Sequence, residues 1–166
     1  MIKLFIGIDP SAINAKTSGA ICINVRSTTG QSLFDSTHCI LLKQTMKDVN
    51  EQFSEILGQY PDKEKYAIIE KVWILPKQGA SGMTEFITGY GFLLGLLVAH
   101  KIPFVQMVPK TWQSHFTPKI AKDRSEHKND LKQIAQNTSA YPKITLYNCD
   151  AILIALYLQK NFSKLF

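Results

Sequence analysis

The segment at residues 3–11 contains a nearly continuous apolar run that ends in one acid, Asp9. Residues 4–8 are apolar apart from Gly7, a pattern typical of a strand that is covered on both faces. Gly7 indicates that another part of the chain approaches the backbone closely there. Pro10 ends the strand, so we expect Asp9 at its tip. Such an acid is costly to bury unless it holds a metal or a proton. The alternative is an acid that caps its own turn.

Two further acids lie in similar apolar surroundings. Residues 65–72 repeat the opening pattern, because an apolar run is followed by Glu70. Asp150 lies among apolar neighbours in the first turn of the expected last helix. An acid at that place is alternatively only a partner of the helix dipole. Three isolated acids in such settings are harder to explain by local roles alone.

Hydrophobic periodicity along the chain predicts alternating strands and helices. We expect strands at 3–9, 19–25, 32–42, 65–72 and 102–108, and helices at 46–57, 83–100, 123–137 and 146–162. Short loops between the first three strands predict an antiparallel meander. The helix that follows favours parallel pairing of the fourth strand with the first, so Asp9 and Glu70 would lie side by side at one edge. The sequence thus predicts one α/β domain, residues 1–166, with a mixed five-stranded sheet flanked by helices.

The 166 residues carry a net charge of +6 at pH 7, which favours a polyanionic partner. Cys22, Cys39 and Cys149 have no paired spacing, so we expect neither a zinc site nor a disulfide framework. The amino terminus lacks a secretory pattern. The best membrane candidate, residues 92–99, is about half of the length that a span needs. We therefore expect a cytoplasmic protein.

Carboxylates that converge without Cys or His favour a hard cation, Mg²⁺ or Mn²⁺, over zinc. Two such ions about 4 Å apart activate a water molecule and stabilise the leaving oxygen of a phosphodiester. Basic residues elsewhere would contact the phosphates. The pattern therefore indicates metal-dependent phosphodiester chemistry.

Several motifs, in order along nearly the whole chain, resemble those of one nuclease family. Gly7-Ile-Asp9-Pro-Ser11, Ile69-Glu70-Lys-Val-Trp73 and Asp150-Ala-Ile-Leu-Ile-Ala155 resemble the three acidic motifs of the RuvC-type Holliday junction resolvases, within the RNase H-like superfamily. The stretches that resemble the phage-type members in particular are residues 79–84, 89–91, 102–105 and 108–112. The resemblance implies an RNase H-like domain.

The resemblance also implies a homodimer that binds a four-way DNA junction, in which each subunit cuts one strand and leaves nicks that can be ligated. Asp9, Glu70 and Asp150 would be the catalytic metal ligands, with Mg²⁺ as the cofactor and Mn²⁺ as a possible substitute. The helix at residues 84–99 would form the dimer interface. Its candidate interface residues are Phe86, Tyr90, Leu93, Leu94 and Leu97.

Glycines are unusually frequent in that helix. Gly89, Gly91 and Gly95 each cost roughly 1 kcal/mol relative to alanine in a helix interior. Close packing against another helix usually offsets this cost. We expect such packing either within the chain or across a dimer.

Candidate DNA contacts follow the basic and aromatic residues. Trp73 lies three residues after the second acid, where bacterial members have an aromatic that stacks near the crossover; the alternative is a core tryptophan. Lys119 and Lys122 lie where the family places lysines near the scissile phosphate, whereas residues 123–136 also fit a solvated surface helix. His115 and His127 are expected at the surface. The full set of candidate DNA contacts is Lys71, Trp73, Lys77, Lys110, Lys119, Lys122 and Arg124.

One departure from the family concerns the fourth metal ligand. The family has an acid or a histidine three positions before the last Asp, and this chain has Tyr147 there. Asn148 would supply a weak amide oxygen ligand. Alternatively, an acid or histidine from residues 123–130 completes the site, or the site holds a single ion weakly. A further alternative is a protein that binds junctions and cuts them poorly or not at all.

Two other functions are compatible with the sequence. The RNase H-like chemistry would also serve an RNA–DNA hybrid or a flap. A sugar- or acetate-kinase-like ATPase fragment would also open with Gly7-Ile-Asp9. This chain lacks a second phosphate loop and the length for two lobes, which argues against the kinase-like fragment.

Overall fold

A computed structural model describes residues 2–13, 19–27, 36–71, 80–116 and 123–166, with only the backbone described for residues 80, 81 and 124. The described strands are β1 (Ile2–Asp9), β2 (Ala20–Ser27), β3 (Ser36–Leu41), β4 (Glu64–Glu70) and β5 (Phe104–Met107). The described helices are α1 (Met46–Gly58), α2 (Ala80–Ala99), α3 (Pro109–Phe116), α4 (Arg124–Thr138) and α5 (Cys149–Leu165).

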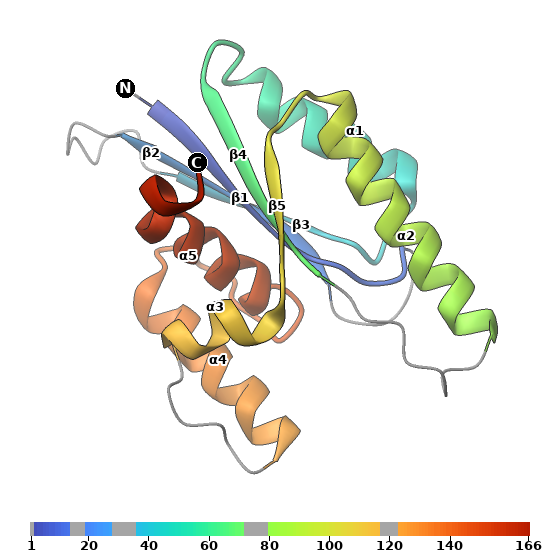
Figure 1. Ribbon diagram of the computed structural model, residues 1–166, viewed down its shortest axis with the longest axis vertical. Coiled ribbons are helices and arrows are strands. Elements are labelled where there is room, and N and C mark those ends of the chain that lie inside the picture. Colours follow the sequence, from blue (N-terminus) through green and yellow to red (C-terminus); the bar gives the residue numbers. More distant parts are fainter. Residues whose placement is uncertain (1, 14–18, 28–35, 72–79, 117–122) are drawn as a thin grey trace.

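The strands form one mixed sheet in the order β3-β2-β1-β4-β5 (Figure 1). β1 pairs antiparallel with β2, and β2 pairs antiparallel with β3. β4 lies parallel to β1 and to β5. The predicted meander and the predicted parallel pairing are therefore both confirmed. The register pairs Ile8 with Ile69, so the next residues, Asp9 and Glu70, end neighbouring strands at the same edge.

Helices cover both faces of the sheet: α1 and α2 lie on one face, and α3, α4 and α5 lie on the other (Figure 1). The strands alternate between the two cores, as the period of two requires. In β1, Leu4, Ile6 and Ile8 pack with α1 and α2, whereas Phe5 packs with α5. Asp9 has the same parity as Phe5, so its carboxylate is directed to the α5 side.

The close approach predicted at Gly7 is confirmed, and helix α5 is the approaching element. A Cβ atom added to Gly7 would lie 2.3 Å from the carbonyl oxygen of Ala151 and 2.4 Å from the backbone nitrogen of Ala155. No side chain fits at that distance. The absence of a side chain therefore lets the first turns of α5 cross β1 directly, and this crossing brings Asp150 to the end of the strand that carries Asp9.

Two elements differ from the sequence-based expectation. Helix α3 was not predicted, because residues 110–132 were interpreted as a basic, polar segment in which only residues 123–137 were expected to be helical. Pro109 suits the first position of a helix, where no backbone donor is required. The last helix begins at Cys149 instead of residue 146, because Thr145 and Asn148 close a turn before it: the Thr145 backbone N–H donates to Asn148 Oδ1 at 2.8 Å.

Helix α2 is apolar on most of its surface. Gly82–Ala99 is long and apolar enough to cross a membrane by length and composition alone, with a mean hydropathy of 1.4, and only 22% of this stretch is buried. The membrane candidate is thus longer than the half-length segment expected from the sequence. Leu96 packs into the sheet's core, whereas Val98 is 65% exposed and Ile87 is 46% exposed. One side of α2 therefore packs on the sheet, and the described residues leave the opposite side uncovered.

The glycines of α2 divide between these two sides. A Cβ on Gly89 would lie 2.8 Å from the carbonyl oxygen of Ser11, so Gly89 packs against the segment after β1 and not against a helix. Nothing described lies within 4 Å of a Cβ on Gly91 or Gly95. Among the described residues, close packing is therefore found only at Gly89, and its partner is not the helix that was expected.

The proposed dimer contacts at Leu93 and Leu97 are wrong for this fold. Both side chains are completely buried in the protomer's own core, against the sheet. Phe86, Tyr90 and Leu94 are partly exposed and stay candidates. The error arose because a helix that is apolar all round gives no indication of which side faces the sheet.

Cys22 and Cys39 lie directly opposite each other on β2 and β3. Leu42 N–H donates to the carbonyl oxygen of Gly19 at 3.1 Å, so these two residues form a hydrogen-bonded pair of the ladder. Counting along the alternating ladder from that pair makes Cys22 and Cys39 a non-hydrogen-bonded pair, in which side chains are closest. Both thiols are free.

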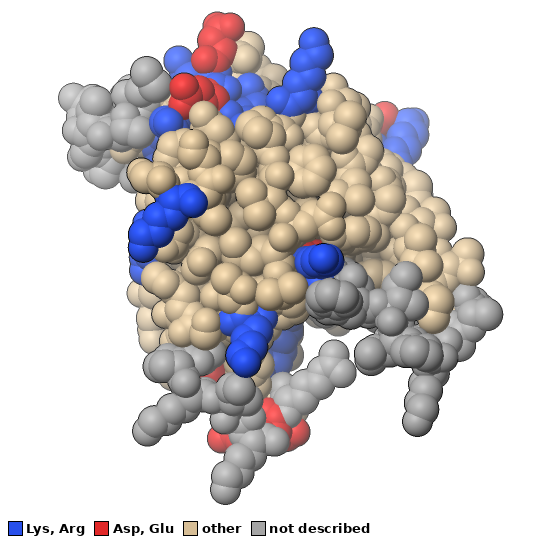
Figure 2. Space-filling view, in the orientation of Figure 1, with Lys and Arg blue, Asp and Glu red and all other residues tan. Residues whose placement is uncertain are grey.

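Charged side chains are unevenly distributed on the face drawn in Figure 2. Several Lys and Arg residues gather with acidic residues at the top edge of this view, and the others lie singly among uncharged residues.

Candidate active site

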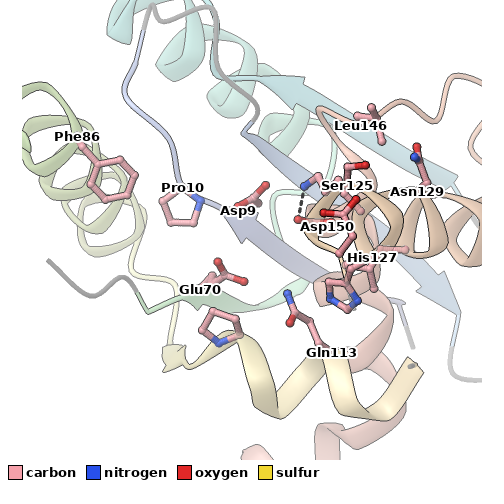
Figure 3. Close-up of a pocket in the computed structure, with 14 residues that line it drawn as sticks. Asp9, Pro10, Glu70, Phe86, Gln113, Ser125, His127, Asn129, Leu146 and Asp150 are labelled. Atoms are coloured by element: carbon pink, nitrogen blue, oxygen red, sulfur yellow. Dashed lines mark hydrogen bonds and ion pairs between the residues drawn. The ribbon is translucent and has the colours of Figure 1, made fainter. Parts of the chain in front are cut away.

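A cavity of about 810 Å³ lies at the edge of the sheet where β1 and β4 end. Its walls come from the ends of these strands, from α2 and α3, and from α4 and α5 (Figure 3). Asp9, Glu70 and Asp150 all line this cavity. The structure thus brings together three acids that are far apart in the sequence, whereas their role as metal ligands stays a prediction.

Two of the three carboxylates, Asp9 and Glu70, are held in surroundings that oppose negative charge. Asp9 is 9% exposed and Asp150 is 8% exposed. Burial, followed by the charges of Asp150 and Glu70, holds the pKa of Asp9 well above its ordinary value. The pKa of Glu70 is raised to about 7, chiefly by burial; the hydrogen bond from Trp112 opposes this increase, and the charge of Asp150 contributes to it. Acids that repel one another in a buried site favour a bound cation or a shared proton.

Lys128 on α4 supplies a positive charge inside this cluster. Its Nζ atom is hydrogen-bonded and ion-paired with Asp150 Oδ2. Burial lowers the pKa of Lys128, but the charges of Asp150 and Asp9 outweigh this effect and raise the pKa above its ordinary value. The sequence analysis missed this lysine. Leu131 and Ala135, three and seven residues later, are buried, and this spacing indicates that Lys128 lies on the inward side of α4.

Asp150 has a second neighbour in Cys149. The Cys149 thiol donates to Asp150 Oδ1 at 3.3 Å. Burial, together with the Asp150 charge, raises the pKa of Cys149 to about 12. The thiol is therefore a neutral donor and not a thiolate ligand at ordinary pH.

Trp112 on α3 is the second functional candidate that the sequence analysis did not assign. Its indole Nε1–H donates to Glu70 Oε2 at 2.8 Å. The Trp112 side chain is completely buried. It was quoted only as part of a family motif, because nothing in the linear sequence connects it with Glu70.

His127 lines the same cavity, although the sequence analysis expected it at the surface (Figure 3). Its Nδ1 atom is buried and has no hydrogen-bond partner among the described residues. Asp123, at the start of α4, also lines the cavity. Of the alternatives for a fourth ligand, the geometry therefore favours a residue from 123–130.

Asn148 and Tyr147 lie away from the cavity lining. Asn148 Oδ1 accepts hydrogen bonds from the backbone N–H and the hydroxyl of Thr145, at 2.8 and 3.3 Å, and its Nδ2 donates to the Lys143 carbonyl at 3.0 Å. Tyr147 is 39% exposed, with Lys43 Nζ 5.1 Å from the centre of its ring. This geometry favours a structural role for Asn148, in the turn before α5, over its predicted role as a ligand.

The donor set of the cavity fits a hard divalent cation, because Asp9, Glu70 and Asp150 offer only oxygen atoms. In the part of the chain that the structure describes, no three His, Cys, Asp or Glu side chains are close enough to hold one ion together. Ion binding would therefore require the carboxylates to move toward one another, with Lys128 giving up its contact with Asp150.

The candidate DNA contacts are only partly described. Lys71 and Lys110 are exposed, and each follows a residue that lines the cavity. The side chain of Arg124, at the first position of α4, is not described. The predictions that fall outside the described residues concern Trp73, Lys77, Lys119 and Lys122.

No protein-family model matches the sequence, and no curated protein matches it either. Solved structures do match. The structure of T. thermophilus RuvC in complex with a Holliday junction substrate aligns with a TM-score of 0.57 and 14% identity, covering 98% of this chain and 96% of that chain. A further Thermus thermophilus RuvC structure aligns with a TM-score of 0.56 and 13% identity, covering 99% and 96%. The chain therefore has a RuvC-like fold, and the predicted RNase H-like architecture is confirmed.

Proposed function

We propose that the protein is a Mg²⁺-dependent, structure-selective endonuclease that resolves four-way DNA junctions as a homodimer. The observation that carries the proposal is the meeting of Asp9, Glu70 and Asp150 in one cavity at the ends of β1 and β4. The similarity of the fold to RuvC, which has been solved with a Holliday junction, supports this substrate class. The resemblance of residues 79–84, 89–91, 102–105 and 108–112 to phage-type members supports that subtype. We further propose a role in DNA recombination and repair in a cytoplasm.

The reacting centre would use the carboxylates to hold the cofactor. When bound, Mg²⁺ or Mn²⁺ activates water and stabilises charge on the departing oxygen of the phosphodiester. Asp9 and Glu70 must release protons to act as ligands, because burial raises both pKa values. Because the acids repel one another, replacing their protons with a bound cation would be favourable.

Lys128 has two partners in this scheme. In the metal-free protein it neutralises Asp150. With Asp150 engaged elsewhere, the Lys128 ammonium becomes available to a phosphate oxygen of the DNA that enters the cavity. Lys71 and Lys110, beside the cavity, would add contacts to the DNA backbone, which position the strand without reading its sequence.

The uncovered side of α2 is the surface that we assign to the dimer. Ile87, Gly91, Gly95 and Val98 follow one another at helical spacing, and nothing described lies within 4 Å of a Cβ on either glycine. A second helix can approach closely along such a surface. Phe86, Tyr90 and Leu94 would lie at its margins.

A second candidate function is a junction-binding protein that cuts poorly or not at all. The contact of Lys128 with Asp150 favours it, because an internal cation already neutralises the cluster. Tyr147, which stands where the family has an acid or a histidine, is not among the residues that line the cavity. An RNase H-like nuclease for RNA–DNA hybrids or flaps is the remaining alternative.

The test is incubation of a labelled immobile four-way junction with and without Mg²⁺ or Mn²⁺, with the products mapped strand by strand. We expect metal-dependent, paired nicks at symmetrical positions. The matched control is Glu70→Gln, which should abolish cutting and leave junction binding nearly intact. Retarded bands without nicked products would support the binding protein instead. Equal affinity for junction, hybrid and duplex would contradict a junction resolvase.

A further inference from the structure

Trp112 joins the hydrophobic core to the candidate metal site. Its side chain is completely buried among residues of the α5-side core, including Ile68 and Met107. Met107 is the register partner of Glu70, and α3 begins two residues after Met107. The short connection from β5 into α3 therefore places the indole beside the end of β4.

The indole nitrogen determines the orientation of Glu70. Nε1–H donates to Oε2 at 2.8 Å, and a hydrogen bond to an ionised acceptor is roughly twice as strong as a neutral one. The indole is a donor only and does not titrate in water. Because close packing fixes the ring, the donor stays in one place, and its hydrogen bond restrains Oε2 while the other carboxylates move toward Glu70.

The other two carboxylates are held differently. Asp150 contacts Lys128, a charged side chain on a flexible stem, and the neutral thiol of Cys149. No hydrogen bond to the Asp9 carboxylate is described. Of Asp9, Glu70 and Asp150, Glu70 is thus the one for which the described contacts include a rigid, permanently neutral donor.

We propose that Trp112 is a positioning residue that holds Glu70 by Oε2 and leaves Oε1 as the oxygen that binds the cation. The inference rests on the proposed function, because it assigns Glu70 as a ligand. Beyond that function, we infer that Glu70 binds the cation through one oxygen atom. Of the two tryptophans of the chain, Trp112 is the one that acts on the metal ligands. Partners that orient ligands in this way typically contribute 10- to 100-fold to metal affinity.

The hydrogen bond can be observed directly by NMR, without any cleavage assay. The chain has two tryptophans, so a ¹⁵N-labelled sample gives two indole signals, and Trp73→Phe assigns them. We expect the Trp112 indole signal to move in Glu70→Gln and to respond to Mg²⁺ titration of the wild type. An indole signal that is unchanged in Glu70→Gln and insensitive to Mg²⁺ would overturn the proposal.

Trp112→Phe tests the consequence, because it keeps an aromatic ring and removes the N–H. We expect calorimetric Mg²⁺ or Mn²⁺ affinity to fall by roughly 10- to 100-fold, with a matching rise in the Mg²⁺ concentration for half-maximal cleavage. The rate at saturating metal and metal-free junction binding should change little. Phe53→Leu, a substitution in the opposite core, is the matched control for destabilisation alone.

The outcomes separate the inference from the proposed function. Wild-type metal affinity in a folded Trp112→Phe that still cuts junctions would overturn the positioning role and leave the nuclease intact. Weakened metal binding in a protein that never cuts would support the positioning role and refute the nuclease. If Trp112→Phe does not fold, the NMR measurement on the wild type and on Glu70→Gln still tests whether Trp112 contacts Glu70.

Discussion

Replacing Lys128 by methionine removes the cation from the carboxylate cluster and keeps most of the apolar stem. Breaking a fully buried ion pair costs roughly 3–5 kcal/mol, because an uncompensated charge remains. Here 27% of the Lys128 side chain and 12% of the Asp150 side chain are exposed, so water screens part of the loss. We therefore expect Lys128→Met to lower the free energy of unfolding by about 2–3 kcal/mol in the absence of metal.

The distinguishing expectation is rescue by a cation. Bound Mg²⁺ would replace the missing positive charge, so saturating Mg²⁺ should stabilise Lys128→Met more than it stabilises the wild type. Urea unfolding with Mg²⁺ and with EDTA measures both effects. The matched control is Lys132→Met, which makes the same charge change one turn further along α4 and should shift stability by less than about 0.5 kcal/mol.

Two results would refute this reasoning. Equal stability of Lys128→Met and Lys132→Met in EDTA would mean that the ion pair contributes nothing. Equal stabilisation of both variants by Mg²⁺ would mean that the cation does not enter the cluster that Lys128 occupies.

Three further expectations concern pH, packing and register. The pKa of Glu70 is raised from 4.5 to about 7, so between these pH values the folded metal-free protein binds more protons than the unfolded chain. Its free energy of unfolding should therefore fall as pH rises from 4.5 to 7, and this group should change it little above pH 7. A free energy of unfolding that rises across this pH range would contradict the raised pKa of Glu70. Gly7→Ala should lower the free energy of unfolding by roughly 1–3 kcal/mol or prevent folding, because the added Cβ would overlap the backbone of α5. The control Gly58→Ala, which has open space around the added Cβ, should unfold like the wild type in the same thermal assay. Mild oxidation with diamide should join Cys22 to Cys39, and peptide mapping that finds either one joined to the third cysteine would contradict the β2–β3 register.

The sequence could predict that the acids lie at one edge of the sheet, because the patterns that indicate this are local in the chain. Each apolar run that ends in one acid is readable from the chain, and the helix between the two strands predicts their parallel pairing. Gly7 gave a further signal, since a glycine within a buried strand indicates a close neighbour. From these features the meeting of Asp9, Glu70 and Asp150 could be expected.

The partners of those acids could not be predicted, because they depend on tertiary packing. Trp112 reaches Glu70 only because β5 lies beside β4 and leads directly into α3. Lys128 lies on a helix whose exposed face is rich in charges, and its inward direction depends on the burial of Leu131 and Ala135. For α2, which is apolar on most of its surface, only the packed structure assigns Leu93 to the core.

The central claim is that Asp9, Glu70 and Asp150 share a divalent cation. The most direct test is an anomalous diffraction measurement on crystals of the protein grown with Mn²⁺. We predict an anomalous peak between the three carboxylates, with a single oxygen of Glu70 as its ligand and with Lys128 displaced from Asp150. Ordered carboxylates with no peak between them at saturating Mn²⁺, and with Lys128 still paired to Asp150, would contradict the account.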